Sequence, residues 1–367
     1  MAASPAQDLA LTDPTLDDLS VFVPVLLQAL ETLGFVARHF HPPRLAELVA
    51  GVGARDEALR AVRPRLDAWP AERAALRAPL VRAADHALAA FDALRAAAAG
   101  AEGPLAAFRA FRHVPLALEA LYPFAQVLPP VSRFFLSPDR RADLDLQQRL
   151  AAAQPRPDTG LLHVDNTYDS RGGFSLYVPE TYTPETALPL VVALHGGSGH
   201  GRAFLFSWLR DARGRGAILA APTSTGPTWA LSGPDPDTPN LKRIVAEVCE
   251  RWAVDPRRIL LTGLSDGGTF AYLSGLEPDS PFTHLAPVAA AFHPMLAEFA
   301  DPERLAGLPV HIVHGALDWM FPADLARQAH RTLAAAGAAV VHREIADLSH
   351  TYPQDMNPAI LDWFMAA

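Results

Sequence analysis

The hydrophobic positions in the first part of the chain recur with a helical period. They step by three or four residues, which places them on one face of a helix: Leu16, Leu19, Val23, Leu26, Leu30 and Leu33. Thr15, with Asp18 three positions later, is typical of the start of such a helix. Pro24 lies inside the stripe and is expected to kink the helix or to mark an earlier start.

A second apolar stripe predicts another long helix that stops at Gly100. Its members are Leu76, Leu80, Ala84, Leu88, Phe91 and Leu94. Shorter helical segments are predicted near 44–50, 104–112 and 115–126, with no strand-like alternation between them. Residues 1–155 therefore predict an N-terminal all-α domain, most economically a helical bundle. The proline-containing segment 151–160 is interpreted as the linker that follows it.

After the linker, the pattern changes to short apolar runs separated by helix-length segments. Two runs that flank a Ser-Arg-Gly-Gly turn predict a β-hairpin: 161–166 and 173–180. The other runs, several rich in Val and Ile as buried parallel strands are, lie at 188–196, 217–222, 257–263, 284–292, 308–315 and 340–345. Strands that alternate with helices predict an α/β domain over 156–367, with a mostly parallel sheet flanked by helices.

Composition agrees with a globular chain of one large and one smaller domain. The chain has 367 residues, of which 50% are hydrophobic. Its net charge is −9 and no basic stripe is present, so we expect no nucleic-acid partner. Cys249 is the only cysteine, which excludes an intramolecular disulfide.

Three further expectations concern location and cofactors. The acidic segment 1–18 lacks the basic start of a signal peptide. No uncharged apolar run of about 18 residues is present, so we expect no membrane span and a cytoplasmic location. The 14 histidines raise the question of a metal site. No HExxH motif or Cys/His cluster at ligand spacing occurs, so neither a metal nor another cofactor is expected.

The first candidate for chemistry is a serine between glycines. Gly263-Leu264-Ser265-Asp266-Gly267 fits the Gly-x-Ser-x-Gly pattern of a nucleophile elbow, a strained turn that holds the serine Oγ clear of the sheet. Small residues at Gly263 and Gly267 let strand and helix approach closely. A glycine-rich turn with an incidental serine fits the five letters equally well. The strand before Ser265 and the helix after it favour the nucleophile.

A nucleophilic serine also needs donors for the oxyanion that forms when it attacks a carbonyl. One donor is expected to be the backbone N–H of Asp266, and the other the N–H of Gly197 in the loop His195-Gly196-Gly197, which follows an earlier strand. His195 itself is expected to bond within this loop. A phosphate-binding loop is the competing interpretation, and it fails because no Lys-Ser/Thr pair follows the glycines.

The serine further needs a base and a partner that fixes the tautomer of that base. Asp318 and His350 each follow a predicted strand, and the chain order Ser265, Asp318, His350 matches the order of nucleophile, acid and base in this architecture. We therefore predict His350 as the base and Asp318 as its orienting partner. Other residues with expected capping, solvent-exposed or structural roles are Asp324, Asp347, His311, His314, His330 and His342; His293 could line the pocket.

At this point four stretches resemble the α/β-hydrolase superfamily: 191–199, 254–272, 313–322 and 348–353. Within it, they look like bacterial esterases of the phospholipase/carboxylesterase group and of the polyhydroxybutyrate-depolymerase-like and feruloyl-esterase-like groups. The resemblance covers about 160–367 and leaves the helical domain without a counterpart. It implies hydrolysis of a carboxylic ester through an acyl-enzyme, with Ser265 as nucleophile, His350 as base and Asp318 as its partner. No cofactor is implied, and the partner is a small-molecule ester.

Aromatic residues in loops beside the strand ends are the candidate substrate walls and favour an apolar acyl or aryl group. They are Trp229, Trp319, Phe321, Tyr352 and Phe204. Two alternatives stay open: a serine peptidase or amidase on the same fold, and a non-catalytic hydrolase-fold binding protein. The helical domain is interpreted as a cap over the site, a homodimerisation surface or a docking module, unless it simply packs against the catalytic domain.

Overall fold

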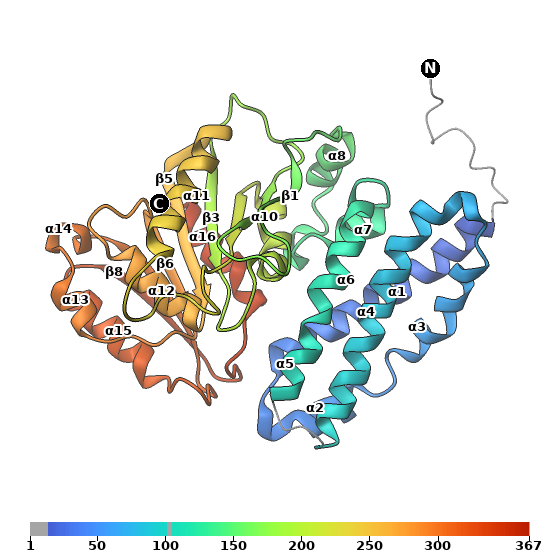
Figure 1. Cartoon of the computed structure of the whole chain (residues 1–367), viewed down its shortest axis with the longest axis horizontal. Coiled ribbons are helices and arrows are strands. Elements are labelled where there is room, and N and C mark those ends of the chain that lie inside the picture. Colours follow the sequence, from blue (N-terminus) through green and yellow to red (C-terminus); the bar gives the residue numbers. More distant parts are fainter. Residues whose placement is uncertain (1–13, 101–104, 367) are drawn as a thin grey trace. The chain divides into compact units, whose positions relative to one another are not determined.

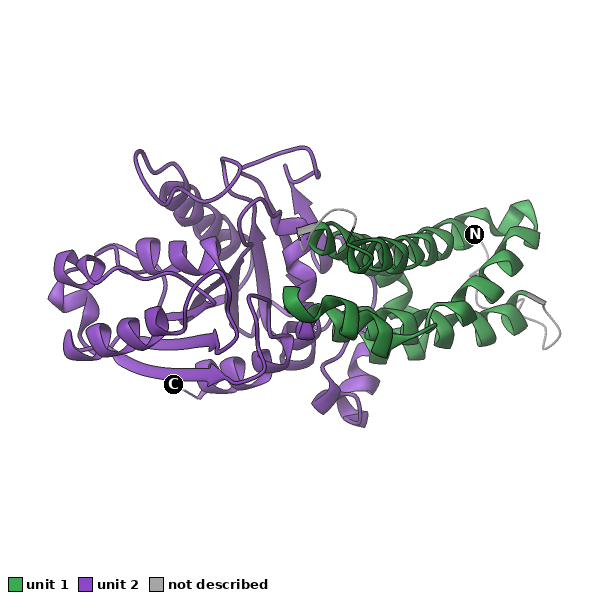
Figure 2. Cartoon of the chain, turned by 90° about the horizontal axis from the view of Figure 1, so that it is seen from below, with its two compact units in different colours: residues 1–37, 42–134 green, residues 38–41, 135–367 purple. Residues whose placement is uncertain are grey.

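The chain folds into two compact units, and the computed structural model describes residues 14–100 and 105–366. Unit 1 comprises 1–37 and 42–134, and unit 2 comprises 38–41 and 135–367 (Figure 2). The predicted boundary at 155 therefore falls within unit 2, and the division of function between 1–155 and 156–367 remains a prediction. Two predictions fall partly outside the described residues. The expectation of no signal peptide rests mostly on residues 1–13, and the predicted helix 104–112 begins at residue 104.

The described part of unit 1 contains helices and no strand, as the sequence predicts. Its helices are α1 (Pro14–His39), α2 (Leu45–Val52), α3 (Glu57–Val62), α4 (Ala74–Ala98), α5 (Leu105–Phe111), α6 (His113–Leu121) and α7 (Pro129–Phe134). Helix α1 contains residues of both units, because its last two residues, Arg38 and His39, belong to unit 2. Helix α1 begins at Pro14, so Thr15 lies in its first turn, and it continues through Pro24.

Helix α4 packs through a face rich in alanine. Four members of the predicted stripe are buried, and alanines fill the positions between them: Leu80, Ala83, Ala84, Ala87, Ala90, Phe91, Leu94 and Ala97. Because alanine carries no side chain beyond Cβ, this face allows close contact with α5 and α6, the helices that α4 contacts most. The alanine richness of the chain therefore has a packing role here.

One helix of unit 1 bears on the expectation of no membrane span. Residues 15–39 of α1 are long enough and apolar enough to cross a membrane. Of the apolar 18-residue stretch within this helix, 39% is buried inside the structure. Its buried positions include four members of the predicted stripe: Val23, Leu26, Leu30 and Leu33. The same length and composition occur in the core helix of a helical bundle.

Unit 2 is built on one eight-stranded sheet whose strand order is β1-β2-β4-β3-β5-β6-β7-β8. Figure 1 shows this sheet among the helices of unit 2. Its strands are β1 (Gly160–Val164), β2 (Phe174–Val178), β3 (Leu188–Leu194), β4 (Ile218–Pro222), β5 (Val254–Leu264), β6 (His284–Val288), β7 (Pro309–Gly315) and β8 (Ala339–Ile345). The first two form the predicted hairpin, and β2 is antiparallel to β4. The remaining pairs are parallel. Every predicted strand is present, although β6 ends four residues early.

Helices cover both faces of this sheet. Those of unit 2 are α8 (Leu144–Ala152), α9 (Gly201–Phe204), α10 (Leu209–Arg215), α11 (Asp237–Arg251), α12 (Asp266–Gly275), α13 (Met295–Phe299), α14 (Pro302–Leu305), α15 (Asp324–Ala335) and α16 (Asn357–Met365). Strand residues such as Leu190, Val192 and Leu261 share a core with α11, α12 and α15. Their neighbours of opposite parity, such as Val191 and Leu260, are buried on the other face. There α10 and α16 contact each other and the strands β4 and β5.

The predicted fold class is confirmed. A mostly parallel sheet flanked by helices follows an N-terminal helical region, and the strand order is that of the α/β-hydrolase fold. Parallel strands place their carboxyl ends at one edge of the sheet, so the loops after β3, β5, β7 and β8 open at that edge. The residues predicted for chemistry lie in these four loops.

Candidate active site

Ser265 occupies a strained turn between β5 and α12. Its backbone has φ 56° and ψ −119°, in the left-handed half of φ that residues with a side chain rarely adopt. Space around the turn is so limited that only glycine fits beside it. A Cβ on Gly263 would lie 2.5 Å from the Gly267 backbone, and a Cβ on Gly267 would lie 2.4 Å from the His195 carbonyl oxygen. These contacts provide the physical reason for the predicted glycines of the elbow.

The structure brings Ser265, His350 and Asp318 together from three different loops. The His350 Nε2 lies 2.9 Å from the Ser265 Oγ, and the His350 Nδ1 lies 2.8 Å from the Asp318 Oδ2. A carboxylate only accepts, so Nδ1 carries the proton and Nε2 is left to accept the Ser265 hydroxyl. Ser265 is 8% exposed and His350 is 5% exposed, so both hydrogen bonds are largely shielded from water.

The carboxylate of Asp318 is fully buried and surrounded by donors. Its Oδ1 accepts the N–H groups of Met320 and Phe321 at 2.9 and 2.8 Å. Burial alone would raise the pKa of Asp318. The nearby His314 and His350 nitrogens and the Phe321 N–H outweigh it and hold that pKa below its usual range. Asp318 is therefore ionised over the whole neutral range.

His314, which the sequence predicts as a purely structural strand residue, also faces this carboxylate. It is the penultimate residue of β7, and its Nε2 lies 3.4 Å from the Asp318 Oδ2. The same nitrogen lies 2.8 Å from the Phe321 carbonyl oxygen, to which it donates. The sequence signal for this role is the position of His314. It lies near the end of the predicted strand 308–315, four residues before Asp318.

The loop after β3 packs directly on the elbow. A Cβ on Gly197 would lie 2.7 Å from the Asp266 Oδ2, and one on Gly196 would lie 3.6 Å from the Ser265 Cβ. Among the hydrogen bonds of the described residues, none uses the backbone N–H of Gly197 or of Asp266. Two donors beside Ser265 are thus free to bind an oxygen of a bound molecule.

His195 holds this loop in place from inside the protein. Burial lowers the pKa of His195 to about 4, so its ring is neutral at pH 7. The Nε2 accepts the N–H of Ser224 at 3.1 Å, and the protonated Nδ1 faces the Gly196 carbonyl oxygen at 2.7 Å. The indole of Trp229 donates to the His195 carbonyl oxygen at 2.7 Å. His195 therefore bonds within the loop, as expected.

The predicted substrate walls divide into two groups. Phe321 lies edge-on to the His350 ring at a centroid distance of 5.2 Å, and Tyr352 lies edge-on to Phe204 at 5.2 Å. Trp319 is 40% exposed in the Asp318 loop. Trp229 differs, because it is 2% exposed and stacks on Phe270 in the core. Trp229 therefore packs against the loop that carries Gly197, and its role at the substrate site stays a prediction.

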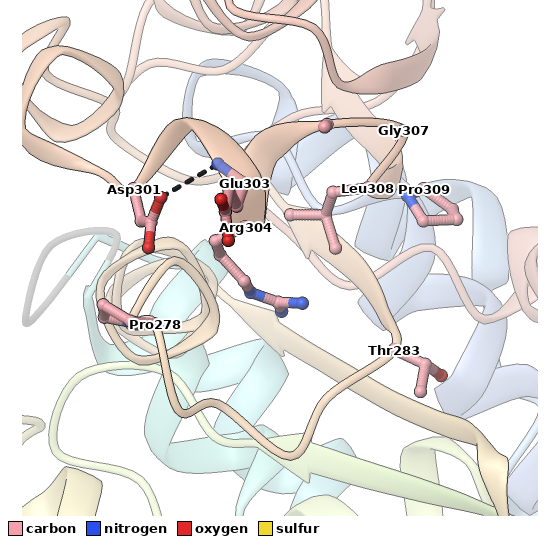
Figure 3. Close-up of a pocket in the computed structure, with 9 residues that line it drawn as sticks. Pro278, Thr283, Asp301, Glu303, Arg304, Gly307, Leu308 and Pro309 are labelled. Carbon is pink, nitrogen blue, oxygen red and sulfur yellow. Dashed lines mark hydrogen bonds between the residues drawn. The ribbon is translucent and has the colours of Figure 1, made fainter.

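A pocket of about 440 Å³ lies elsewhere in unit 2. Figure 3 shows the residues that line it. Its lining includes Thr283 and Pro309, at the starts of β6 and β7, so it opens at the opposite edge of the sheet. The Arg304 guanidinium is held there by the carbonyl oxygens of Gly275 and Phe282. None of the residues predicted for chemistry lines it. Within the described residues, no group of three or more His, Cys, Asp or Glu side chains is placed to hold a metal ion.

No protein-family model matches the chain, and no curated protein matches it. Solved structures do. A thermostable esterase is 20% identical with a TM-score of 0.47, over 57% of this chain and 63% of the other. A butyrate-bound esterase from the Planctomycetes species Thermogutta terrifontis is 19% identical with a TM-score of 0.44, over 58% and 95%.

An acylaminoacyl peptidase from Pyrococcus horikoshii is 14% identical with a TM-score of 0.43, over 56% of this chain and 41% of that chain. The match to the thermostable esterase covers 63% of that protein, so more than a third of its length has no counterpart in this chain. With identities of at most 20% and TM-scores of at most 0.47, these similarities decide nothing about the reaction or the substrate.

Proposed function

We propose that this chain is a serine hydrolase that cleaves carboxylic esters through an acyl-enzyme. The observation that carries the proposal is the unbroken hydrogen-bonded chain from the Ser265 Oγ through His350 to Asp318. It starts at a strained turn beside two unused backbone N–H groups. A nucleophile, a base, an orienting carboxylate and oxyanion donors are the four parts that acyl transfer requires.

Each part has a defined step. The Ser265 Oγ attacks the ester carbonyl carbon while His350 Nε2 takes its proton, and the Gly197 and Asp266 N–H groups bind the oxyanion. The tetrahedral intermediate collapses when His350 returns that proton to the departing alkoxide, which leaves as an alcohol. The same nitrogen then deprotonates a water molecule that attacks the acyl-enzyme. Collapse of the second intermediate releases the acid and restores the Ser265 hydroxyl.

Asp318 supports both half-reactions without gaining a proton. Its charge fixes the Nδ1–H tautomer of His350 and stabilises the imidazolium that forms during each transfer. The low pKa of Asp318 serves this role, because a neutral acid in the same place would stabilise the imidazolium far less. His350 Nε2 is thereby kept available to the Ser265 hydroxyl.

The side chains around the triad favour an apolar acyl or aryl group. Phe321 contacts the base, and Trp319 and Met320 present exposed apolar surface in the same loop. Tyr352, two residues beyond His350, forms an edge-on aromatic pair with Phe204. An ester of a small apolar acid would find van der Waals partners there and leave only its carbonyl oxygen to the backbone donors.

The experiment combines active-site labelling with a comparison of substrates. A fluorophosphonate probe is expected to label the folded protein at Ser265, and p-nitrophenyl esters are expected to react faster than aminoacyl anilides. Ser265→Ala should lose the labelling and about 10⁴-fold or more in kcat. Ser274→Ala is the matched control, because Ser274 is another buried serine, in α12. This variant should retain both the labelling and the wild-type kcat.

Three outcomes would redirect the proposal. Faster anilide turnover would make the protein a peptidase or amidase on the same fold. Absence of labelling in folded protein would make it a non-catalytic binding protein. Label on a residue other than Ser265 would move the site.

A further inference from the structure

The loop that carries His350 is held by a short segment from far earlier in the chain. Arg38, His39, Phe40 and His41 belong to unit 2 although the residues on both sides of them belong to unit 1. We call residues 38–41 the brace. The Arg38 Nε lies 2.8 Å from the Asp355 Oδ1, and its Nη2 lies 3.3 Å from the Asp347 Oδ1.

Two further contacts fall closer to the base. The Thr351 hydroxyl donates to the Arg38 carbonyl oxygen at 3.2 Å, and the His41 Nδ1 lies 3.3 Å from the Ser349 Oγ. Ser349 and Thr351 are the immediate neighbours of His350 in the chain. The brace therefore touches the loop before and after the base, at four points between residues 347 and 355.

The loop also has anchors other than the brace. Leu348 and Ser349 are buried, and the Tyr352 hydroxyl donates to the Asn357 Oδ1 at 2.7 Å. The loop leaves β8 at Ile345 and reaches the next helical turn at Gln354. The backbone bond between it and a neighbouring segment runs from the Leu317 N–H to the Leu348 carbonyl oxygen at 2.9 Å. No helix or strand geometry fixes the backbone of His350. Side-chain contacts, those of the brace among them, therefore help to define its place.

Arg38 is the central residue of the brace. Its side chain is 14% exposed, whereas those of Asp347 and Asp355 are 63% and 55% exposed. Exposed ion pairs add little to stability one by one. A largely buried guanidinium that bridges two carboxylates eight residues apart nevertheless restricts the segment between them, because its planar fork fixes the direction of each bond.

We propose that the brace positions His350 for the reaction, with Arg38 as the main positioning residue. This inference rests on the proposed hydrolase function. A displacement of about 1 Å in a catalytic group can cost about 100-fold in rate. Because the brace contacts the loop of the base and not a residue proposed to bind the acyl group, substrate binding should change little. Loss of the brace is therefore expected to lower kcat and to leave KM nearly unchanged.

The test compares variants of the full-length chain. Arg38→Ala is expected to lower kcat on a p-nitrophenyl ester by about 10-fold or more, with KM within about twofold. Arg38→Lys should recover part of the loss, because an ammonium keeps the charge and reaches one carboxylate at a time. Arg44→Ala is the matched control, since Arg44 forms an exposed pair with Glu47 in unit 1 and should leave kcat unchanged.

A second variant keeps the proposal open to refutation if Arg38→Ala fails to fold. The double change Asp347→Ala with Asp355→Ala removes both acceptors of the Arg38 bridge at two exposed positions and should lower kcat to a similar extent. A folded Arg38→Ala or double variant with wild-type kcat would overturn the proposal. A fall in kcat that Arg44→Ala shares would overturn it as well.

Amide hydrogen exchange separates this proposal from the proposed function. Exchange in peptides spanning 346–353 should become faster in Arg38→Ala, while exchange in α12 stays unchanged. That readout does not depend on turnover, so faster exchange in a protein without esterase activity would support the brace and refute the hydrolase. Unchanged exchange together with unchanged kcat in an active enzyme would refute the brace alone.

Discussion

His314 Nε2 lies 3.4 Å from Asp318 Oδ2, so two histidines, one from β7 and one from the loop after β8, face the same buried carboxylate oxygen. The His314 proton is donated to the Phe321 carbonyl oxygen at 2.8 Å. Its other ring nitrogen is buried without a hydrogen-bond partner among the described residues. His314 thereby links the end of the strand to the turn that carries Asp318 and Phe321.

Replacement of His314 by Ala should therefore weaken the turn around Asp318. We expect a loss of about 1–3 kcal/mol in the free energy of unfolding, because the Phe321 carbonyl oxygen loses its buried donor, and a several-fold fall in kcat. Steady-state kinetics and urea unfolding measure the two effects. His311→Ala is the control. His311 lies on the same strand and is buried against Trp363 away from the carboxylate, so its loss should affect stability and spare kcat. Equal kcat losses in both variants would contradict this role of His314.

The acid sensitivity of the fold should depend on His195. Burial lowers the pKa of His195 to about 4 in the folded state, whereas the unfolded value is about 6.5. The unfolded chain then binds a proton that the folded chain does not bind, and stability falls as the pH drops from about 6.5 to about 4. Above that window the contribution of His195 is fully present.

The size of this effect is up to about 3 kcal/mol across the window. Urea unfolding of the wild type and of His195→Asn at several pH values measures it. The variant should be less stable at pH 7, because Ser224 N–H and Gly196 carbonyl contacts are altered, but its stability should change less between pH 6.5 and 4. Parallel pH profiles for the two proteins would show that His195 is not a source of the acid sensitivity.

Two glycine substitutions should have opposite effects on stability. Gly267→Ala places a Cβ 2.4 Å from the His195 carbonyl oxygen, so it should separate the elbow from the Gly197 loop and lower both stability and kcat strongly. Gly34→Ala, in the interior of α1 with open space around the new Cβ, should stabilise the helix by about 0.5–1 kcal/mol. Thermal unfolding and ester hydrolysis measure both. Normal activity in Gly267→Ala would show that the close approach is dispensable.

The loop aromatics should control the acyl group. Trp319→Ala removes exposed apolar surface beside Asp318, so KM for hexanoyl and longer p-nitrophenyl esters is expected to rise several-fold, with little change for the acetyl ester. A chain-length series on the purified variant measures this. Leu144→Ala, at an apolar residue of α8 that is 68% exposed, serves as the control and should leave the series unchanged. Uniform changes across all chain lengths would exclude a specific acyl contact for Trp319.

The eight strands, and the loops after β3, β5, β7 and β8 that carry the candidate catalytic residues, could be predicted from the sequence because their signals are local. Each strand is a short apolar run between turn residues, and the glycines around Ser265 follow from the space that a strand-to-helix turn leaves. The order of Ser265, Asp318 and His350 added a long-range expectation that the structure's geometry matches.

The remaining features depend on contacts between distant residues, which periodicity does not reveal. Arg38 and Asp355 are separated by 317 positions, and nothing near Arg38 in the sequence marks it as a neighbour of the base. Trp229 was predicted at the substrate site from its place after a strand. In the structure Trp229 is buried, and its indole N–H donates to the carbonyl oxygen of His195, which lies 34 positions earlier in the chain.

The discontinuity of unit 2 also has a genetic consequence. Residues 38–41 are encoded ahead of the segment for 42–134, so the codons of unit 2 do not form one uninterrupted block. A recombination event that exchanged the helical unit at a single junction would also remove the brace from the His350 loop. We therefore expect a chimaera to be functional only if its donor helix supplies an arginine equivalent to Arg38. Substitutions at the end of α1 would then depend on the residues of the His350 loop.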